Sequence, residues 1–135
     1  MRLAVLIALF AAMLLTGCTQ TQTTSNDFTG ERKQVADRVA DLADDGQRKR
    51  ADAICENLLA DELVKQVSAA GSSCAAEMKK AIDDADGFDL EVTKVDINGS
   101  NATATVRSQD RGKNVDRTFE FVKQDGDWRI TGFGG

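Results

Sequence analysis

The sequence predicts an α+β fold in which three helices are followed by a four-stranded antiparallel sheet. Two observations support this class. Apolar residues recur at helical spacing from about Glu31 to Ile82, whereas from Gly87 onward they alternate with polar residues as they do in strands. In addition, every helical segment precedes every strand segment, an order that is typical of α+β domains. The 135 residues leave room for one such domain.

The first two helices are expected between residues 31 and 71. The first has an apolar face formed by Val35, Val39 and Leu42, and Asp44-Asp45-Gly46 is expected to end it. The second is expected from about residue 48 to Gly71, because glycine commonly follows the last turn of a helix. Its apolar stripe consists of Ile54, Leu58, Leu59, Leu63 and Val67.

A third helix is expected to start at Cys74, with Ser72 or Ser73 as its N-cap. Cys74, Met78 and Ile82 then share one face, because residues four apart lie above one another on a helix. We expect this helix to end where the strand pattern begins.

Four strands are expected, over about 90–97, 102–106, 115–121 and 128–133. A slip in the apolar alternation near Thr93-Lys94 predicts a β-bulge in the first strand. Turn sequences separate the strands, so each strand should pair with the next. These turns are Asn98-Gly99, Asp110-Arg111-Gly112-Lys113 and Asp125-Gly126.

The first residues have the features of an export leader. Arg2 precedes an unbroken apolar run of about thirteen residues from Leu3 to Leu15, which is too short to span a bilayer that needs about twenty. Leu15-Thr16-Gly17-Cys18 follows, and it resembles the lipobox of bacterial lipoproteins. We therefore predict a lipoprotein signal peptide over 1–17 and lipidation of Cys18. The alternative is an ordinary secretory signal in which Cys18 is incidental, although no A-x-A cleavage site follows.

The predicted mature protein has a short tether and one domain. Residues 18–29 comprise the lipidated Cys and a polar, low-complexity tether, and residues 30–135 comprise the domain. Without Arg2 the chain has sixteen Lys and Arg against twenty-two Asp and Glu, a net charge of −6. Such an acidic protein is repelled by nucleic acid, so its acyl chains are expected to hold it at the outer face of the cytoplasmic membrane.

The other two cysteines, Cys55 and Cys74, are expected to form a disulfide, because export places them in an oxidising compartment. The loop between them has about twenty residues, so the bond would stabilise the fold by about 3 kcal/mol. The alternative is a pair of buried free thiols. A metal site is not expected, because the chain contains no His to complete one.

Several segments resemble the small exported bacterial lipoproteins that have a nuclear-transport-factor-2-like, or cystatin-like, domain. The segments that carry this resemblance are Cys55-x-x-Leu58-Leu59 with Cys74, Val95-x-Ile97-x-Gly99 into Ala102-x-Ala104, Phe119-x-Phe121 and Gly126-x-Trp128-Arg129-Ile130. The resemblance implies a cone in which a curved sheet wraps a long helix and leaves a pocket at one end. Enzymes of that superfamily use His-Asp, Tyr-Asp or Asp-Arg-Asp groups, but this chain has no His and no Tyr. We therefore expect no catalytic residues and no cofactor.

Two charged segments are candidate binding sites. The acidic segment 83–91 resembles a Ca²⁺ loop, but alignment on Gly87 puts Ile82 and Thr93 at the first and last ligand positions. A solvated acidic turn is the better interpretation. The basic segment 47–50 is interpreted as a solvated turn balanced by neighbouring Asp residues, with an anion site as the alternative.

The candidate pocket residues are Phe119, Phe121, Trp128 and Ile130, which otherwise form ordinary core. We expect a non-catalytic binding or interaction module in the cell envelope, whose partner is an envelope protein. One alternative is a carrier of a small apolar molecule in the cone interior, and another is an enzyme with an Asp base. A homodimer formed through the open sheet face is a further alternative.

Overall fold

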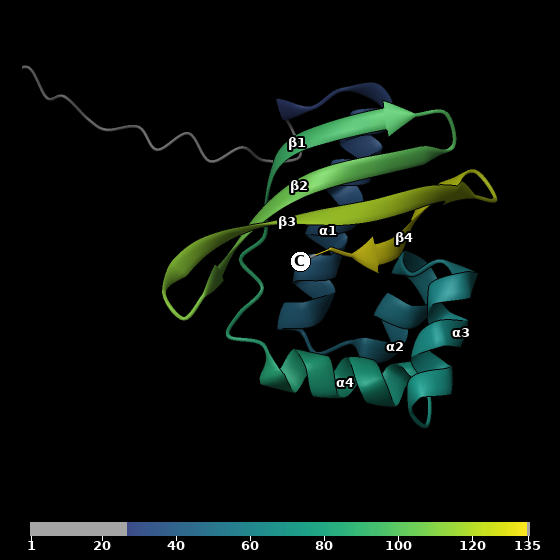
Figure 1. The fold of residues 1–135 in the computed structure, drawn as a ribbon, viewed down its shortest axis with the longest axis vertical. Helices are drawn as coiled ribbons and strands as arrows, with labels where there is room; N and C mark the ends of the chain where they lie inside the picture. The colour runs from purple at the N-terminus through teal and green to yellow at the C-terminus, as the bar shows by residue number, and fades with distance from the viewer. Residues whose placement is uncertain (1–26, 135) are drawn as a thin grey trace, which may run out of the picture.

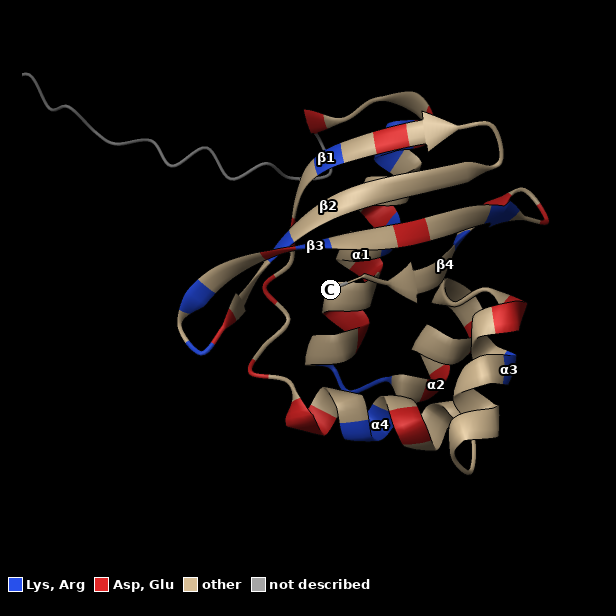
Figure 2. Ribbon diagram, viewed as in Figure 1, with Lys and Arg blue, Asp and Glu red and all other residues tan. Residues whose placement is uncertain are grey.

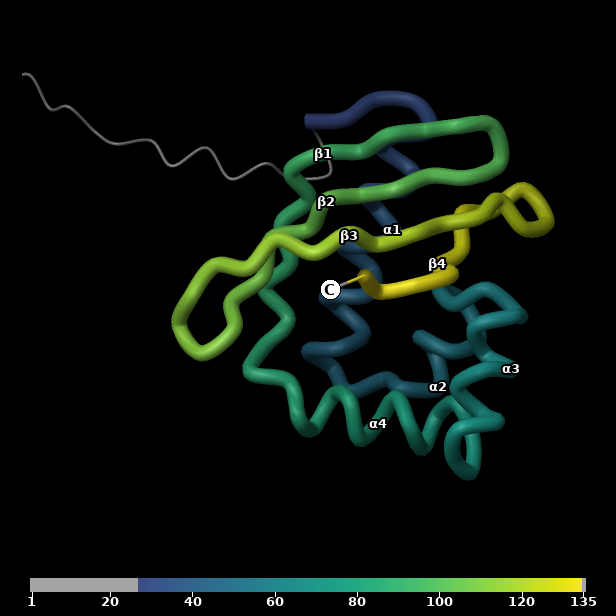
Figure 3. Tube along the Cα trace, in the orientation of Figure 1, coloured from purple at the N-terminus to yellow at the C-terminus, as the bar shows by residue number. Residues whose placement is uncertain are grey.

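The computed structural model describes residues 27–134 (Figure 1). The predicted signal peptide over 1–17, the lipidation site Cys18 and most of the predicted tether lie outside the described residues. Within them, the first helix crosses behind the strands of a single antiparallel sheet, and the other helices lie together beyond one edge of that sheet (Figure 3). The predicted α+β class is confirmed.

The helical part precedes the sheet in the chain. It consists of α1 (Gly30–Gln47), α2 (Ala51–Ala53), the π-helical turn η2 (Ile54–Leu58), α3 (Asp61–Ala70) and α4 (Cys74–Asp84). The strands are β1 (Glu91–Asn98), β2 (Asn101–Asp110), β3 (Lys113–Gln124) and β4 (Asp127–Phe133). Each strand pairs with the next, so the sheet is an open meander in the order β1-β2-β3-β4.

Helix α1 is longer than the sequence predicted, because Asp44-Asp45-Gly46 does not end it. The helix continues to Gln47, and Gly46 is buried within its last turn. A Cβ at Gly46 would overlap the ring of Phe88, so glycine is needed there for close packing. Val35 and Val39, which lie nearer the N-terminus of α1, have no exposed surface.

The prediction of one continuous second helix is wrong, because its residues form α2, η2 and α3. The described residues therefore contain four α-helices rather than three. The chain leaves η2 at Leu59 and is extended through Ala60 before α3 begins. Leu58, Leu59 and Ala60 are all at most 2% exposed, and one face of a helix cannot bury three consecutive residues. The extended pair instead contacts β4, where the Ala60 N–H donates to the Ile130 carbonyl at 2.8 Å.

Three local predictions are confirmed. The Ser73 hydroxyl caps α4 by accepting from the Ala76 N–H at 3.2 Å. The register of β1 against β2 shifts between Val92 and Lys94, as the predicted bulge requires. Asp125 and Gly126 both have positive φ angles, of 53° and 87°, which is the geometry of a tight type I′ hairpin turn.

The core lies between α1 and the inner face of the sheet. It also includes the apolar side chains of η2 and α4, and it is closed by β4. The most deeply buried large side chains are Trp128, Phe121, Ile54, Leu58, Leu59 and Ile130. Because β4 packs against α1, the β3–β4 turn lies beside the N-terminal half of this helix.

Candidate functional site

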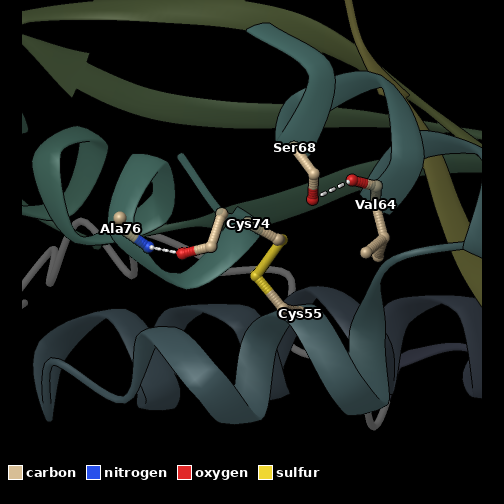
Figure 4. The surroundings of a disulfide bond; sticks show 6 residues. Cys55, Val64, Ser68, Cys74 and Ala76 are labelled. Carbon is tan, nitrogen blue, oxygen red and sulfur yellow. Dashed lines mark hydrogen bonds between the residues drawn. A yellow bond between two sulfur atoms is a disulfide. The ribbon is translucent and has the colours of Figure 1, made fainter. Parts of the chain in front are cut away.

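Cys55 and Cys74 form a disulfide, as predicted. Cys55 lies in η2, and Cys74 is the first residue of α4, so the bond joins two helical elements that pack side by side (Figure 4). The sulfur atoms therefore have a structural role in the helical half of the domain, away from the sheet.

The four predicted pocket residues all lie in the core. Phe119, Phe121, Trp128 and Ile130 are at most 6% exposed and face inward from β3 and β4. Phe119 also packs edge-to-face on Phe133, with 5.0 Å between the ring centroids. Of the four, Trp128 also contributes to a surface hollow, which is polar rather than apolar.

The basic segment 47–50 is held in ion pairs. Arg48 and Arg50 contact the Asp44 carboxylate at 2.9 and 2.8 Å, and Arg50 also contacts the buried Asp45 at 2.5 Å. Across the interface with α4, the Asp83 carboxylate accepts from two lysines. We call this group the paired charge cluster; it comprises Asp44, Asp45, Asp83, Arg48, Lys49, Arg50 and Lys79.

The pKa of Asp83 shows how well this cluster is balanced. Hydrogen bonds from Lys79 and then Lys49 hold the pKa of the Asp83 carboxyl below its usual value. A lowered carboxyl pKa means that the anion is stabilised by its surroundings. The paired charge cluster therefore joins α1, the connection 48–50 and α4, and its charges already have partners.

The acidic segment 83–91 has a second structural contact. The Asp86 carboxylate accepts from the Arg111 N–H at 3.1 Å and so attaches the β2–β3 hairpin tip to the α4–β1 connection. A small hollow of about 210 Å³ lies there, with Asp89 and Gln109 also in its lining. Among residues 27–134, no three metal-ligating side chains come together.

The outer face of the sheet is polar, because the exposed residues that alternate with the core include Asp96, Thr103 and Glu120. Residues of both charges occur on β1 and β3 (Figure 2). Thr103 lies opposite Glu120 on neighbouring strands, and Arg107 donates to Asp116 at 3.0 Å. The only large apolar side chain exposed in the described part of the chain is Phe133. This face therefore gives no support to a homodimer formed through an apolar sheet surface.

A second hollow, of about 480 Å³, lies between α1 and the β3–β4 turn, and the sequence did not predict it. We call it the α1–β4 hollow; its lining consists of Gln34, Asp37, Arg38, Ala40, Asp41, Gly126, Asp127 and Trp128. Gln34, Arg38 and Asp41 recur at helical spacing and so lie on one side of α1. The tight turn at Gly126 brings β4 back against that side.

The electrostatics of the α1–β4 hollow are unbalanced. One guanidinium, that of Arg38, contacts both Asp41 and Asp127, at 3.5 and 3.4 Å. Partial burial raises the pKa of the Asp41 carboxyl, and the attraction of Arg38 does not overcome burial together with repulsion from Asp45, Asp37 and Asp44. Burial is the main cause of this raised pKa, although the Asp41 side chain is 55% exposed.

The side chain of Trp128 borders this hollow, but its indole nitrogen is buried. It is 1% exposed, and its indole Nε1–H has no acceptor among residues 27–134. A buried N–H without a partner costs about 1–3 kcal/mol, which makes such groups rare. On β3, Lys123 lies over the Trp128 ring with its Nζ 5.5 Å from the centroid, and it also pairs with Glu31. The nearby lysine is thus already engaged.

These groups can bind a ligand through ion pairs and hydrogen bonds. The lining offers carboxylates, one guanidinium and an amide, but no thiol, hydroxyl or imidazole. The sequence alone places the α1 residues on one side of a helix and predicts the Asp125-Gly126 turn. It does not predict that the helix and the turn come into contact, because Arg38 and Asp127 are 89 residues apart.

Comparison with known families adds one finding. The model for low molecular weight antigen MTB12, C-terminal domain, matches residues 60–132. This chain belongs to that family. The MTB12 C-terminal domain family indicates an exported protein, in agreement with the predicted leader. No curated protein and no solved structure matches the chain.

The MTB12-type match covers only part of the candidate site. It includes α3, α4 and most of the sheet, and hence Trp128 and Asp127, but it begins after α1. The α1 side of the hollow therefore lies outside the matched residues. In the described range 27–134, no helix is both long enough and apolar enough to cross a bilayer.

Proposed function

We propose that this protein is a lipid-anchored, non-catalytic binding module of the cell envelope. A diacylglycerol on Cys18 holds it at the outer face of the cytoplasmic membrane, and the exported domain binds a protein partner there. The observation that carries this proposal is Leu15-Thr16-Gly17-Cys18 directly after a short apolar run. Family membership supports the exported location.

The start of the domain is compatible with such an anchor. Helix α1 begins at Gly30, so twelve residues from Cys18 to Thr29 separate the proposed lipid from the first helix. Twelve residues of extended chain reach about 40 Å, which is enough to hold the whole domain clear of the lipid headgroups. Binding surfaces on any side of the domain would then remain accessible.

Two features support binding at the surface over the other functions considered. The predicted pocket residues are buried in the core, whereas the α1–β4 hollow is open and polar. Asp41 is the carboxylate with a raised pKa, as an Asp-based enzyme would need, but it is 55% exposed at the edge of the hollow. It is better placed to contact a partner than to act as a buried base.

We further propose that the domain has a nuclear-transport-factor-2-like, cone-shaped fold. The order of the elements supports this, because helices come first and a four-stranded meander follows them. The position of α1 against the inner face of the sheet is also what the resemblance implies.

The anchor is tested by replacing Cys18. In the producing bacterium, Cys18→Ala should move the protein from the membrane fraction to the soluble extracellular fraction, and mass spectrometry of the wild type should find a diacylglycerol on residue 18. The matched control is the double variant Cys55→Ala/Cys74→Ala, which removes the other two cysteines and should stay with the membrane. Retention in the membrane of a Cys18→Ala protein whose leader has been removed, or an unmodified residue 18 in the wild type, contradicts the proposal.

A further inference from the structure

Helices α3 and α4 are attached to the rest of the domain by few buried side chains. We call residues 61–84 the α3–α4 hairpin; it lies beyond one edge of the sheet (Figure 1). No residue of α3 is buried, and α4 buries only Cys74 and Ile82. Helix α1, by contrast, buries six of its residues. Segments with few buried contacts open at a lower free energy than the rest of a fold.

The chain on both sides of the α3–α4 hairpin is fixed by contacts outside it. Before the hairpin, the Ala60 N–H donates to the Ile130 carbonyl at 2.8 Å. After it, the Asp86 carboxylate accepts from the Arg111 N–H at 3.1 Å, and the ring of Phe88 packs against α1. The hairpin could therefore open while α1 and the sheet keep their own contacts.

The disulfide is a covalent tie between the α3–α4 hairpin and the rest of the domain. Cys74 is the first residue of α4, and Cys55 lies in η2, which is outside the hairpin (Figure 4). The bond holds the hairpin near its middle and divides residues 61–84 into two shorter loops. Without the bond these residues form one longer loop, which gains more conformational entropy when it opens.

The polar ties of the hairpin are weak by comparison. The Asp61 N–H donates to Gln124 Oε1 at 3.2 Å at the start of α3. At the end of α4, Asp83 pairs with Lys49 at 3.1 Å, but the lysine side chain is 70% exposed. Exposed ion pairs contribute little to stability. The disulfide is therefore the tie whose loss should matter most.

We propose that the Cys55–Cys74 disulfide is a redox switch that controls opening of the α3–α4 hairpin. While the bond is intact, the hairpin is closed. When a dithiol in the cell envelope reduces it, residues 61–84 open as one unit, and α1 and the sheet stay folded. Opening uncovers the side of η2 on which α4 packs, together with the partly buried Leu63, Val64 and Val67 of α3.

The reduction is an ordinary thiol–disulfide exchange. Cys55 is partly exposed, whereas Cys74 is buried, so the first thiolate of the dithiol attacks Cys55 Sγ. The bond to Cys74 breaks, and Cys74 leaves as a thiolate that takes up a proton. The second thiolate of the dithiol then attacks its own sulfur in the mixed disulfide and releases Cys55, which is also protonated. Two electrons and two protons pass to the cysteines, and the dithiol is oxidised to a disulfide.

Amide hydrogen exchange with mass spectrometry tests the switch on the exported protein in detergent micelles. Exchange is compared before and after reduction by dithiothreitol at neutral pH, and alkylation confirms that both thiols are free. We expect residues 61–84 to exchange at least about tenfold faster after reduction, with residues 101–122 of β2 and β3 unchanged. Unchanged exchange over 61–84, equal acceleration over 101–122, or a bond that resists dithiothreitol overturns the proposal.

Two variants separate the switch from other causes. Cys55→Ala/Cys74→Ala without dithiothreitol should exchange like the reduced wild type, and adding the dithiol should change nothing. An effect of dithiothreitol on this variant would overturn the proposal, because the reagent would act elsewhere. The matched control is Val106→Ala with the disulfide intact, since Val106 is 1% exposed on β2. If this variant also accelerated exchange over 61–84 alone, general loss of stability would be a sufficient cause, and the proposal would be wrong.

This inference goes beyond the proposed function and does not depend on the lipid anchor. An unmodified residue 18 would contradict the anchor and leave the hydrogen exchange of residues 61–84 unaffected. Equal exchange in the oxidised and reduced protein would contradict the switch and leave the anchored module in place.

Discussion

Helix α1 contributes carboxylates to two regions of the surface that differ in how their charge is balanced. At its C-terminal end, Asp44 and Asp45 join the paired charge cluster, in which arginines and lysines lie 2.5–3.1 Å from the carboxylates. One turn earlier, Asp41 lines the α1–β4 hollow and shares one arginine with Asp127. The same residue type on the same helix is thus paired at one place and poorly paired at the other.

The pKa values of carboxyls in these two regions also differ. The pKa of Asp83 in the paired charge cluster is lowered, whereas the pKa of Asp41 in the hollow is raised. A lowered carboxyl pKa indicates that nearby groups stabilise the anion, whereas a raised pKa indicates burial or neighbouring negative charge. The surroundings of Asp83 thus favour its ionised form, and those of Asp41 disfavour it.

The largest expected effect comes from the disulfide, which lies on the helical side with the paired charge cluster. The double variant Cys55→Ala/Cys74→Ala should lose about 3 kcal/mol of unfolding free energy, since the cysteines are 19 residues apart. Urea denaturation followed by the fluorescence of Trp128 measures the loss.

An unchanged urea midpoint would contradict this interpretation of the disulfide, because it would mean that the stability of the helical side does not depend on the bond. Cys18→Ala is the matched control and should unfold at the same urea concentration as the wild type.

The next largest effect is expected within the paired charge cluster. Asp45 is 8% exposed and contacts Arg50 at 2.5 Å, so Asp45→Asn should cost about 1–2 kcal/mol at neutral pH. The control is Asp37→Asn, because Asp37 is 42% exposed and pairs with Lys33 along the helix. Such a pair contributes about 0.3–0.5 kcal/mol. Equal losses in thermal unfolding would show that burial does not distinguish the two carboxylates.

Features that depend on neighbouring residues could be predicted from the sequence. The Asp125-Gly126 turn fixes its own hairpin through two positive φ angles, and Ser73 caps the helix that directly follows it. The break at Leu59 could not be predicted in the same way, because the hydrogen bond that favours it reaches Ile130, seventy residues further along. Helical periodicity alone continues through this point.

The candidate site was missed for the same physical reason. Sequence reasoning placed Trp128 correctly on the inner face of the sheet. It could not show that the indole N–H lacks an acceptor, because that depends on how α1 packs against β4. The contact of Arg38 with Asp127 also depends on this packing. Periodicity identifies the face of a helix or strand on which a residue lies. Only the tertiary arrangement shows which charged side chains contact one another.

A smaller effect is expected at Asp41, with a defined dependence on pH. Burial raises the folded-state pKa of Asp41 above its ordinary value of 3.8, so ionisation above that value disfavours the folded state. Asp41→Asn should therefore raise the unfolding free energy at pH 7, by only a few tenths of a kcal/mol because the side chain is 55% exposed. At pH 3 the gain should vanish. Urea denaturation at both pH values measures this, and a loss at pH 7 would contradict it.

The smallest effect is expected at Asp83, and its sign is the opposite. Lysine hydrogen bonds lower its folded-state pKa, so its contribution is present above the ordinary value of 3.8 and is lost as the pH falls through the folded pKa. Asp83→Asn should thus lower the thermal midpoint slightly at pH 7 and leave it unchanged in strong acid. Asp84→Asn, one residue further along α4, is the control for the change in net charge. If Asp41→Asn and Asp83→Asn shifted stability in the same direction at pH 7, the two acidic regions would not differ as proposed, since net charge alone would explain both.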